Sequence, residues 1–312
     1  MSERRCAVVA ILGAPNAGKS TLVNALVGEK IAIVTHKVQT TRAPLRGIAL
    51  RGDAQLVLID TPGVFAPKRR LERAMVRAAW ASLDGADAIV HVVDAASYAR
   101  TQMGGASGAD GHARADVERI QARLAETKRT AILALNKVDA MARPDLLTVA
   151  RAFNETGLYA DVFMISALTG DGVEDLAKKL AEAAPVGPWL FPEDQIADAP
   201  ARVLAAETTR EQLMLRLHEE IPYEATVETE SWQARKDSSV RIDQTIFVAR
   251  ESQRKIVIGE KGQTIKAIGQ AARKSLEETL GRRVHLFLHV KVREGWSEER
   301  ARYAALGLDY DA

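Results

Sequence analysis

The sequence predicts an α/β fold, in which a doubly wound, mostly parallel sheet is followed by a smaller α+β domain. Three observations support this prediction. Apolar runs with the length of buried strands alternate with helical segments, polar motifs follow the ends of these strands, and prolines gather in 185–201. We therefore expect a nucleotide-binding domain over 1–184, a linker over 185–201 and a second domain with a C-terminal tail over 202–312.

Length and composition limit the classes of protein. A chain of 312 residues can form two domains, each with its own core. The 43 basic and 41 acidic residues leave a net charge of +2, so the overall charge alone predicts no polyanionic partner. The single cysteine, Cys6, excludes an intrachain disulfide and fits a reducing compartment. No apolar stretch approaches the roughly 20 residues that span a bilayer, and we expect a soluble, cytoplasmic protein.

The first strand, expected over 7–12, leads into a loop that matches the phosphate-binding pattern G-x-x-x-x-G-K-[ST] at every fixed position. A helical segment, 21–27, follows it. Backbone N–H groups of such a loop surround a phosphate chain, Lys19 reaches the terminal phosphates and the Ser20 hydroxyl can bind magnesium. The alternative is an ordinary glycine-rich turn. The expected phosphate-binding residues are Gly13, Ala14, Pro15, Asn16, Ala17, Gly18, Lys19, Ser20 and Thr21.

A polar, hydroxyl-rich loop is expected over 35–42 because this stretch has no periodicity. In a nucleotide-hydrolysing domain, a threonine here can bind magnesium only while the last phosphate is present, so the loop responds to the nucleotide state. We favour Thr41 for this role, with Thr40 as the alternative.

A hairpin of strands 48–50 and 55–59 ends on Asp60-Thr61-Pro62-Gly63. Asp60 can hold the magnesium shell, and the Gly63 N–H can bind the last phosphate. Asp-x-x-Gly is usually only a turn, but here it follows Ser20 by 40 residues with two strands between. Beyond it we expect a helix over 71–83, a strand over 88–94, a mobile, glycine-rich excursion over 97–115 and a helix over 116–125.

Two further motifs follow the strands expected over 130–135 and 162–165, and a helix over 173–184 closes the domain. In Asn-Lys-x-Asp, Asp139 can accept hydrogen bonds from N1–H and the 2-amino group of guanine, which adenine cannot match. Lys137 would lie along the base, and Asn136 would connect neighbouring loops. The residues expected to surround the base are Asn136, Lys137, Asp139, Ser166, Ala167 and Leu168.

The second domain is expected to have a helix over 208–220, strands over 225–232 and 240–250, two helices around a Gly-x-x-Gly turn, and a strand over 284–292. Such a turn lets a sugar-phosphate backbone lie against it, although Gly-x-x-Gly is more often an ordinary turn. Residues 250–293 contain 11 basic and 4 acidic side chains, a local excess that is typical of a nucleic-acid-binding face. The expected RNA-binding residues are Ile258, Gly259, Glu260, Lys261, Gly262, Thr264, Ile265 and Lys266.

Together, these motifs resemble known families. The set 13–20, Thr41, 60–63, 136–139 and 166–168 resembles the five sequence boxes of a translation-factor-related GTPase. Gly-x-Pro-Asn-x-Gly-Lys-Ser with Gln-Thr-Thr-Arg resembles the bacterial Era branch of these GTPases. The second domain resembles a type-2 KH RNA-binding domain, and the ending Val-Lys-Val-Arg-Glu-Gly-Trp is similar to the Era C-terminus.

The resemblance implies a magnesium-dependent GTPase that binds GTP and GDP. It also implies that the protein binds the 3′ end of 16S ribosomal RNA, assists maturation of the 30S subunit, acts as a monomer and, as in some relatives, associates peripherally with the inner face of the cell membrane. Direct magnesium ligands would be Ser20 and Thr41, with Asp60 orienting the shell. The implied catalytic residues are Lys19, Thr41, Gly63 and Asn16.

Two departures from family patterns are visible. Val64 follows Gly63, and a valine cannot orient water as a glutamine does. We therefore expect slow hydrolysis unless another charge assists, and related GTPases imply a potassium ion bound with the help of Asn16. The segment around 104–111 resembles an insertion relative to Era.

Two rival functions fit the sequence less well. An RNA-binding protein with a vestigial nucleotide domain would need a broken motif, and none is broken. An ATP-using enzyme would have to lack the guanine contact expected from Asp139.

Overall fold

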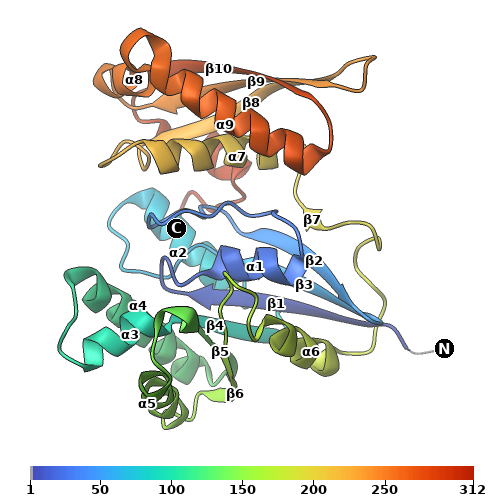
Figure 1. Cartoon of the computed structure of the whole chain (residues 1–312), viewed down its shortest axis with the longest axis vertical. Helices are drawn as coiled ribbons and strands as arrows, with labels where there is room; N and C mark the ends of the chain where they lie inside the picture. Colours follow the sequence, from blue (N-terminus) through green and yellow to red (C-terminus); the bar gives the residue numbers. More distant parts are fainter. Residues whose placement is uncertain (1–2) are drawn as a thin grey trace. The chain divides into compact units, whose positions relative to one another are not determined.

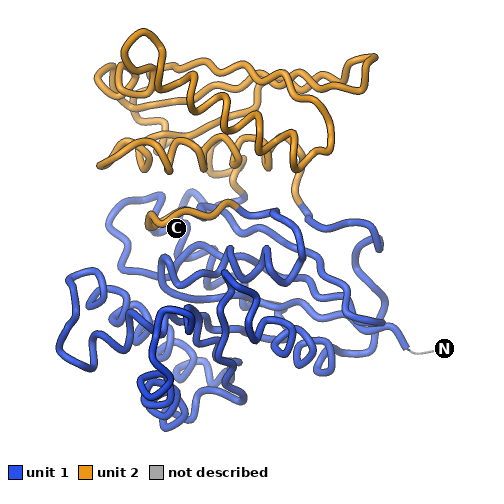
Figure 2. The backbone as a smooth tube through the Cα atoms, in the orientation of Figure 1, with its two compact units in different colours: residues 1–32, 41–198, 307–312 blue, residues 33–40, 199–306 orange. Residues whose placement is uncertain are grey.

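The computed structural model describes residues 3–312, so the first two residues of the domain expected over 1–184 lie outside the described part. The chain forms two compact units (Figure 2). Unit 1 comprises residues up to 32, 41–198 and 307–312, and unit 2 comprises 33–40 and 199–306. Two short segments depart from the expected division of the chain. Residues 33–40, within the first half, belong to unit 2, and residues 307–312, at the C-terminus, belong to unit 1.

Unit 1 is built on a seven-stranded sheet with the order β6-β5-β4-β1-β3-β2-β7 (Figure 1). Strand β1 pairs in parallel with β3 and β4, the β4-β5-β6 pairs are also parallel, and only β2 and β7 run antiparallel to their neighbours. The predicted doubly wound, mostly parallel sheet is confirmed. Its elements are β1 (Arg5–Gly13), α1 (Lys19–Val27), β2 (Leu45–Arg51), β3 (Ala54–Asp60), α2 (Arg70–Ala81), β4 (Ala88–Asp94), α3 (Ala95–Gln102), α4 (Gly108–Thr127), β5 (Ala131–Asn136), η1 (Val138–Ala140), α5 (Arg143–Asn154), β6 (Tyr159–Met164), α6 (Val173–Ala183) and β7 (Ala197–Asp198).

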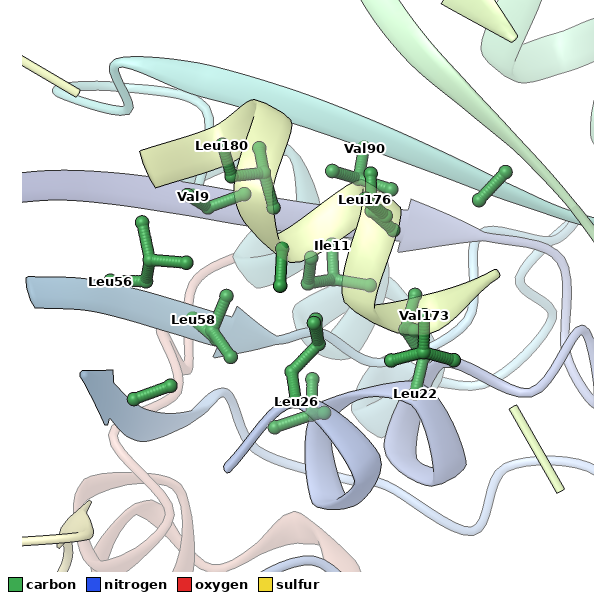
Figure 3. Close-up of a cluster of buried hydrophobic side chains, with 14 of the residues drawn as sticks. Val9, Ile11, Leu22, Leu26, Leu56, Leu58, Val90, Val173, Leu176 and Leu180 are labelled. Carbon is green, nitrogen blue, oxygen red and sulfur yellow. The ribbon is translucent and has the colours of Figure 1, made fainter. Parts of the chain in front are cut away.

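Strand β1 is apolar from Ala7 to Leu12 because both of its faces are covered by helices there. Val9 and Ile11 pack with residues of α1 and α6 on one face, as Figure 3 shows. Ala10 and Leu12 point to the other face, where they join Ile120 of α4. All five side chains are buried. The carboxyl end of β1 is thereby fixed where the phosphate-binding loop begins.

The expectation of an irregular, mobile excursion over 97–115 is wrong for most of that stretch, which lies in helices α3 and α4. Ser107 caps α4, and Asp110 bonds back to the Ser107 backbone in a capping box. Asp110 also accepts hydrogen bonds from Arg100 Nη2 and Ser97 Oγ of α3, both at 2.6 Å. The Arg100 contact comes first among the interactions that hold the Asp110 pKa well below its usual range. The glycine-rich sequence therefore forms a capped helix start.

The expected linker is attached to the sheet of unit 1 at β3 and at β2. Gln55 of β3 is buried, and its Oε1 accepts the N–H groups of Leu190 at 2.9 Å and Phe191 at 3.0 Å. Its Nε2 donates to the Phe191 carbonyl at 2.8 Å. Further along, β7 pairs with β2. The expected linker consequently belongs to unit 1 as far as residue 198.

Unit 2 has a three-stranded sheet with the order β10-β9-β8, in which β10 is parallel and β8 antiparallel to β9 (Figure 1). Its core includes Leu213, Ile246, Val257 and Ile268. The predicted α+β arrangement is confirmed, although its first helix begins at Ala201 instead of 208. The elements are α7 (Ala201–Arg216), β8 (Ala225–Ala234), β9 (Val240–Val248), α8 (Glu251–Ile258), η2 (Glu260–Gly262), α9 (Gln263–Leu280), β10 (Val284–Val292), η3 (Trp296–Glu298) and α10 (Arg300–Ala305).

Candidate nucleotide and RNA sites

The phosphate-binding loop connects the end of β1 to the start of α1 and requires glycine at both ends. A Cβ atom on Gly13 would lie 2.4 Å from the Val92 carbonyl oxygen of the neighbouring strand. Gly18 has a φ of +98°, and a Cβ there would lie 2.1 Å from Asn136 Nδ2. Asn16, at the exposed tip, also has a positive φ of 62°. These contacts account for the glycines of the motif in physical terms.

Lys19 lies in the first turn of α1 with its ammonium group directed back at the loop. Nζ donates hydrogen bonds to the carbonyl oxygens of Gly13 at 3.1 Å and Ala14 at 2.9 Å. The residue is only 6% exposed, and this burial lowers the pKa of Lys19 to about 8, while the charge of Asp60 opposes the shift. A phosphate group entering the loop would supply the anion that favours the charged ammonium.

Three oxygen-bearing side chains meet beside the loop. Ser20 Oγ donates to Asp60 Oδ2 at 2.7 Å, and Thr41 Oγ1 lies 2.9 Å from Ser20 Oγ and 3.2 Å from Asp60 Oδ2. The second carboxylate oxygen of Asp60 is buried without a hydrogen-bond partner among residues 3–312. Burial raises the pKa of Asp60 to about 6. Hard oxygen donors around an unsatisfied carboxylate fit the coordination preferences of magnesium.

Thr40 and Thr41 differ in what they contact. Thr40 Oγ1 donates to the Lys37 carbonyl at 2.8 Å and lies 2.7 Å from Thr35 Oγ1, inside its own loop. The structure thus brings Thr41, and not Thr40, to Ser20 and Asp60.

The segment after Asp60 lies against the phosphate-binding loop. Thr61 Oγ1 donates to the Ile11 carbonyl at 2.7 Å, and a Cβ on Gly63 would lie 2.9 Å from the Pro15 nitrogen. Pro62 between them is buried. Val64 is fully buried in the apolar cluster between the sheet and the helices. The residue that follows Gly63 therefore points into the core, where it cannot orient a water molecule.

Asn136, at the end of β5, connects the phosphate-binding loop to the loop 166–168 that is expected to contact the base. Its Nδ2 donates to the Ala17 carbonyl at 2.8 Å, and its Oδ1 accepts the Ala167 N–H at 2.9 Å. Asp139 is exposed in η1, and Leu168 is 81% exposed, whereas Ser166 is buried. The exposed carboxylate of Asp139 is free to meet the edge of a base.

Lys137 has a partner that sequence analysis missed. Its Nζ lies 2.6 Å from Oδ2 of Asp94, which also caps α3 by accepting the Ser97 N–H. Lys137 itself has a φ of 66°, so its stem leaves the strand in the left-handed conformation. Asp94 comes at the end of a largely apolar strand. Asp60 is predicted as a site residue from the same sequence pattern.

The Gly-x-x-Gly turn of unit 2 lies between α8 and α9. Gly259 has a φ of 74°, and a Cβ there would lie 2.1 Å from Thr264 Oγ1, whereas nothing lies within 4 Å of a Cβ on Gly262. Glu260 and Lys261 at the tip are exposed. Of the other predicted residues, Ile258, Thr264 and Ile265 are half-buried and Lys266 is exposed. An open Gly-x-x-Gly turn with a basic side chain at its tip is thus present.

The comparisons agree with this geometry. A family model described as a 50S ribosome-binding GTPase matches residues 8–137, and a KH domain model matches 220–297. The GTPase Era of Caulobacter vibrioides is 58% identical over 310 residues, covering 99% of this chain and 98% of the relative. Era of Brucella suis is 55% identical over 309 residues, covering 99% and 95%.

Two solved structures match nearly the whole chain. One is a crystal structure of Era in complex with MgGDPNP and nucleotides 1506–1542 of 16S ribosomal RNA, with a TM-score of 0.87 and 34% identity, covering 97% of this chain and 99% of that one. The other, an Aquifex aeolicus Era variant bound to GDP and AlF4−, has the same TM-score, identity and coverage.

The fold and the two sites define a P-loop GTPase joined to a KH RNA-binding domain. Identity above 50% over almost the full length then settles the family. The chain belongs to the GTPase Era family. The predicted fold class and GTPase activity are confirmed.

Proposed function

We propose that the protein binds the 3′ end of small-subunit ribosomal RNA through its KH domain, under control of GTP, and assists maturation of the 30S subunit. The observation that carries the proposal is the turn 259–262, which is open at Gly262 and lies within the basic stretch 250–293. The related Era structure with nucleotides of 16S ribosomal RNA supports the choice of RNA.

In the proposed mechanism, the main predicted residues of the nucleotide site have separate roles. Lys19 and the loop amides would bind the phosphates, and Asp139 would accept hydrogen bonds from guanine. Ser20 and Thr41 would hold a magnesium ion directly, with Asp60 orienting its shell. When bound, the ion would neutralise charge that develops on the phosphates. The Era complex with MgGDPNP supports this choice of metal.

Binding of a short RNA with the 16S 3′-end sequence tests the proposed function. We expect the full-length protein to bind it more tightly with a non-hydrolysable GTP analogue than with GDP. Affinity should be measured at fixed salt, because phosphate contacts make it salt-dependent. An RNA of the same length and scrambled sequence is the control. Equal affinity in the two nucleotide states would contradict gating by GTP.

Hydrolysis is expected to run several-fold faster in potassium chloride than in sodium chloride. Val64 is buried and cannot position water, so another group must stabilise the transition state, and we propose a potassium ion bound with the help of Asn16 at the exposed loop tip. Steady-state phosphate release in the two salts, at equal ionic strength, measures the effect.

Two variants separate this role of Asn16 from a general effect of salt. Asn16→Ala should remove the potassium response, and Asn154→Ala, which truncates an exposed asparagine at the end of α5, should keep it. A potassium response that survives in Asn16→Ala would exclude this residue from the cation site.

The family resemblance also leads us to propose a cytoplasmic monomer that associates peripherally with the inner face of the cell membrane. Within residues 3–312, no helix combines the length and apolarity needed to cross a bilayer. Light scattering and co-sedimentation with anionic vesicles would test the oligomeric state and the membrane contact.

A further inference from the structure

Residues 33–40, the loop that leads to Thr41, fold as part of unit 2, whereas Thr41 itself belongs to unit 1 (Figure 2). The chain therefore passes from one unit to the other at the peptide bond between Thr40 and Thr41. This bond lies next to the residue that meets Ser20 and Asp60.

Helix α7 holds the loop 33–40 at several points. Glu211 Oε1 accepts the Val34 N–H at 2.9 Å, and the Lys37 ammonium donates to the Leu217 carbonyl just beyond the helix. Desolvation at this contact lowers the pKa of Lys37. The third contact is at the end of the loop, where the Arg210 guanidinium donates to the Thr40 carbonyl.

Arg210 is itself held in one orientation. It is 1% exposed, and its guanidinium forms an ion pair with Glu207 one turn earlier, with Nε 2.8 Å from Glu207 Oε1. Its Nη1 lies 3.2 Å from Met214 Sδ one turn later. A planar guanidinium fixed on two sides presents its remaining N–H groups in one direction. The Thr40 carbonyl lies in that direction.

A hydrogen bond to the Thr40 carbonyl also orients Thr41, because the carbonyl and the Thr41 nitrogen share one planar peptide unit. Fixing this plane fixes the position of the Thr41 Cα and restricts where its hydroxyl can lie. The Thr41 hydroxyl lies within 3.2 Å of both Ser20 Oγ and Asp60 Oδ2.

We infer that Arg210, a residue of helix α7 in unit 2, is a positioning residue for GTP hydrolysis: by holding the Thr40 carbonyl, it places the Thr41 hydroxyl at the metal site. The inference rests on the proposed role of Thr41 as a magnesium ligand. A residue of unit 2 thereby influences the position of a residue of unit 1 through the peptide bond between Thr40 and Thr41.

The test measures GTP hydrolysis by the full-length protein at a series of magnesium concentrations. Arg210→Met should lower kcat about tenfold and raise the magnesium concentration needed for half-maximal rate, because small displacements of catalytic groups are costly. Arg210→Lys, which keeps the charge beside Glu207 but lacks the fork, should show the same direction of change. GDP affinity should stay unchanged in both variants.

Matched variants distinguish positioning from a general loss of structure. Arg216→Met truncates an exposed arginine on the same helix and should leave the magnesium dependence as it is. Thermal unfolding shows whether each variant is folded. Because Arg210→Lys keeps the ion-pair charge, it remains informative if Arg210→Met fails to fold.

A double-mutant cycle with Thr41→Ala tests whether the effect of Arg210 on hydrolysis is transmitted through Thr41. If Arg210 acts through Thr41, the double variant Thr41→Ala, Arg210→Met will be no slower than Thr41→Ala alone. Additive losses, or an unchanged magnesium dependence in Arg210→Lys, would overturn the inference. If Thr41→Ala itself leaves the magnesium dependence unchanged, the proposed metal role of Thr41 fails instead, so the two failures are distinguishable.

Discussion

Replacing Asp139 with asparagine should lower the affinity for GTP about 1,000-fold and raise the affinity for XTP, because two hydrogen bonds to a carboxylate are lost and the amide can donate to the 2-carbonyl of xanthine. Asp139 is exposed in η1, so the substitution leaves the core intact. Competition of GTP and XTP against a fluorescent guanine nucleotide measures the change.

The control for this exchange is Asp84→Asn, which makes the same change of charge at an exposed position in another loop of unit 1. It should keep the preference for GTP. An Asp139→Asn protein that still prefers GTP over XTP would mean that another group reads the base.

Replacing Gly262 with aspartate should weaken binding of the 16S 3′-end RNA by about tenfold or more, since it places a negative charge where the phosphate backbone would lie. Gly262 has a φ of 77° and ψ of 14°, a left-handed conformation that aspartate tolerates, and nothing lies within 4 Å of its Cβ position. Fluorescence anisotropy at fixed salt measures the loss.

Substitutions of two other glycines, Gly281 and Gly259, serve as comparisons for this variant. Gly281 also has a left-handed φ, of 60°, and an open Cβ position, but it lies at the far end of α9, about 27 Å away along an 18-residue helix. Gly281→Asp should bind RNA normally. Gly259→Asp should lose binding as well, but the clash of its Cβ with Thr264 would also disturb the fold, which makes it the poorer variant. Normal RNA binding by Gly262→Asp would remove the turn from the interface.

The nucleotide site could be predicted from sequence because, apart from Thr41, its parts are local motifs that follow a buried strand. The sheet then brings them together, as the contacts of Asn136 with Ala17 and Ala167 show. The start of helix α4, within the expected excursion 97–115, could also have been predicted from sequence, since Ser107 and Asp110 have the spacing of a capping box. Composition alone was misleading there, because glycine and alanine can begin a helix once a cap is present.

The contacts of the loop 33–40 could not be predicted in this way. Arg210 lies 170 residues after Thr40, and no sequence motif that contains one of these residues predicts a contact with the other. A buried arginine in a helix has no sequence signature, because periodicity counts it as an exposed position. Only the tertiary structure shows that α7 and this loop share one compact unit.

The passage of the chain between the two units has a practical consequence for dissecting the protein. The backbone changes unit at 32/33, 40/41, 198/199 and 306/307. A fragment ending at 198 would carry the loop 33–40 without helix α7, and a fragment beginning at 199 would carry α7 without its loop and would keep a tail, 307–312, whose partners Arg77 and Arg70 are missing. Nucleotide turnover by an isolated N-terminal half would therefore report on an enzyme whose loop 33–40 lacks its contacts with α7, and its rate is not a baseline for the intact chain.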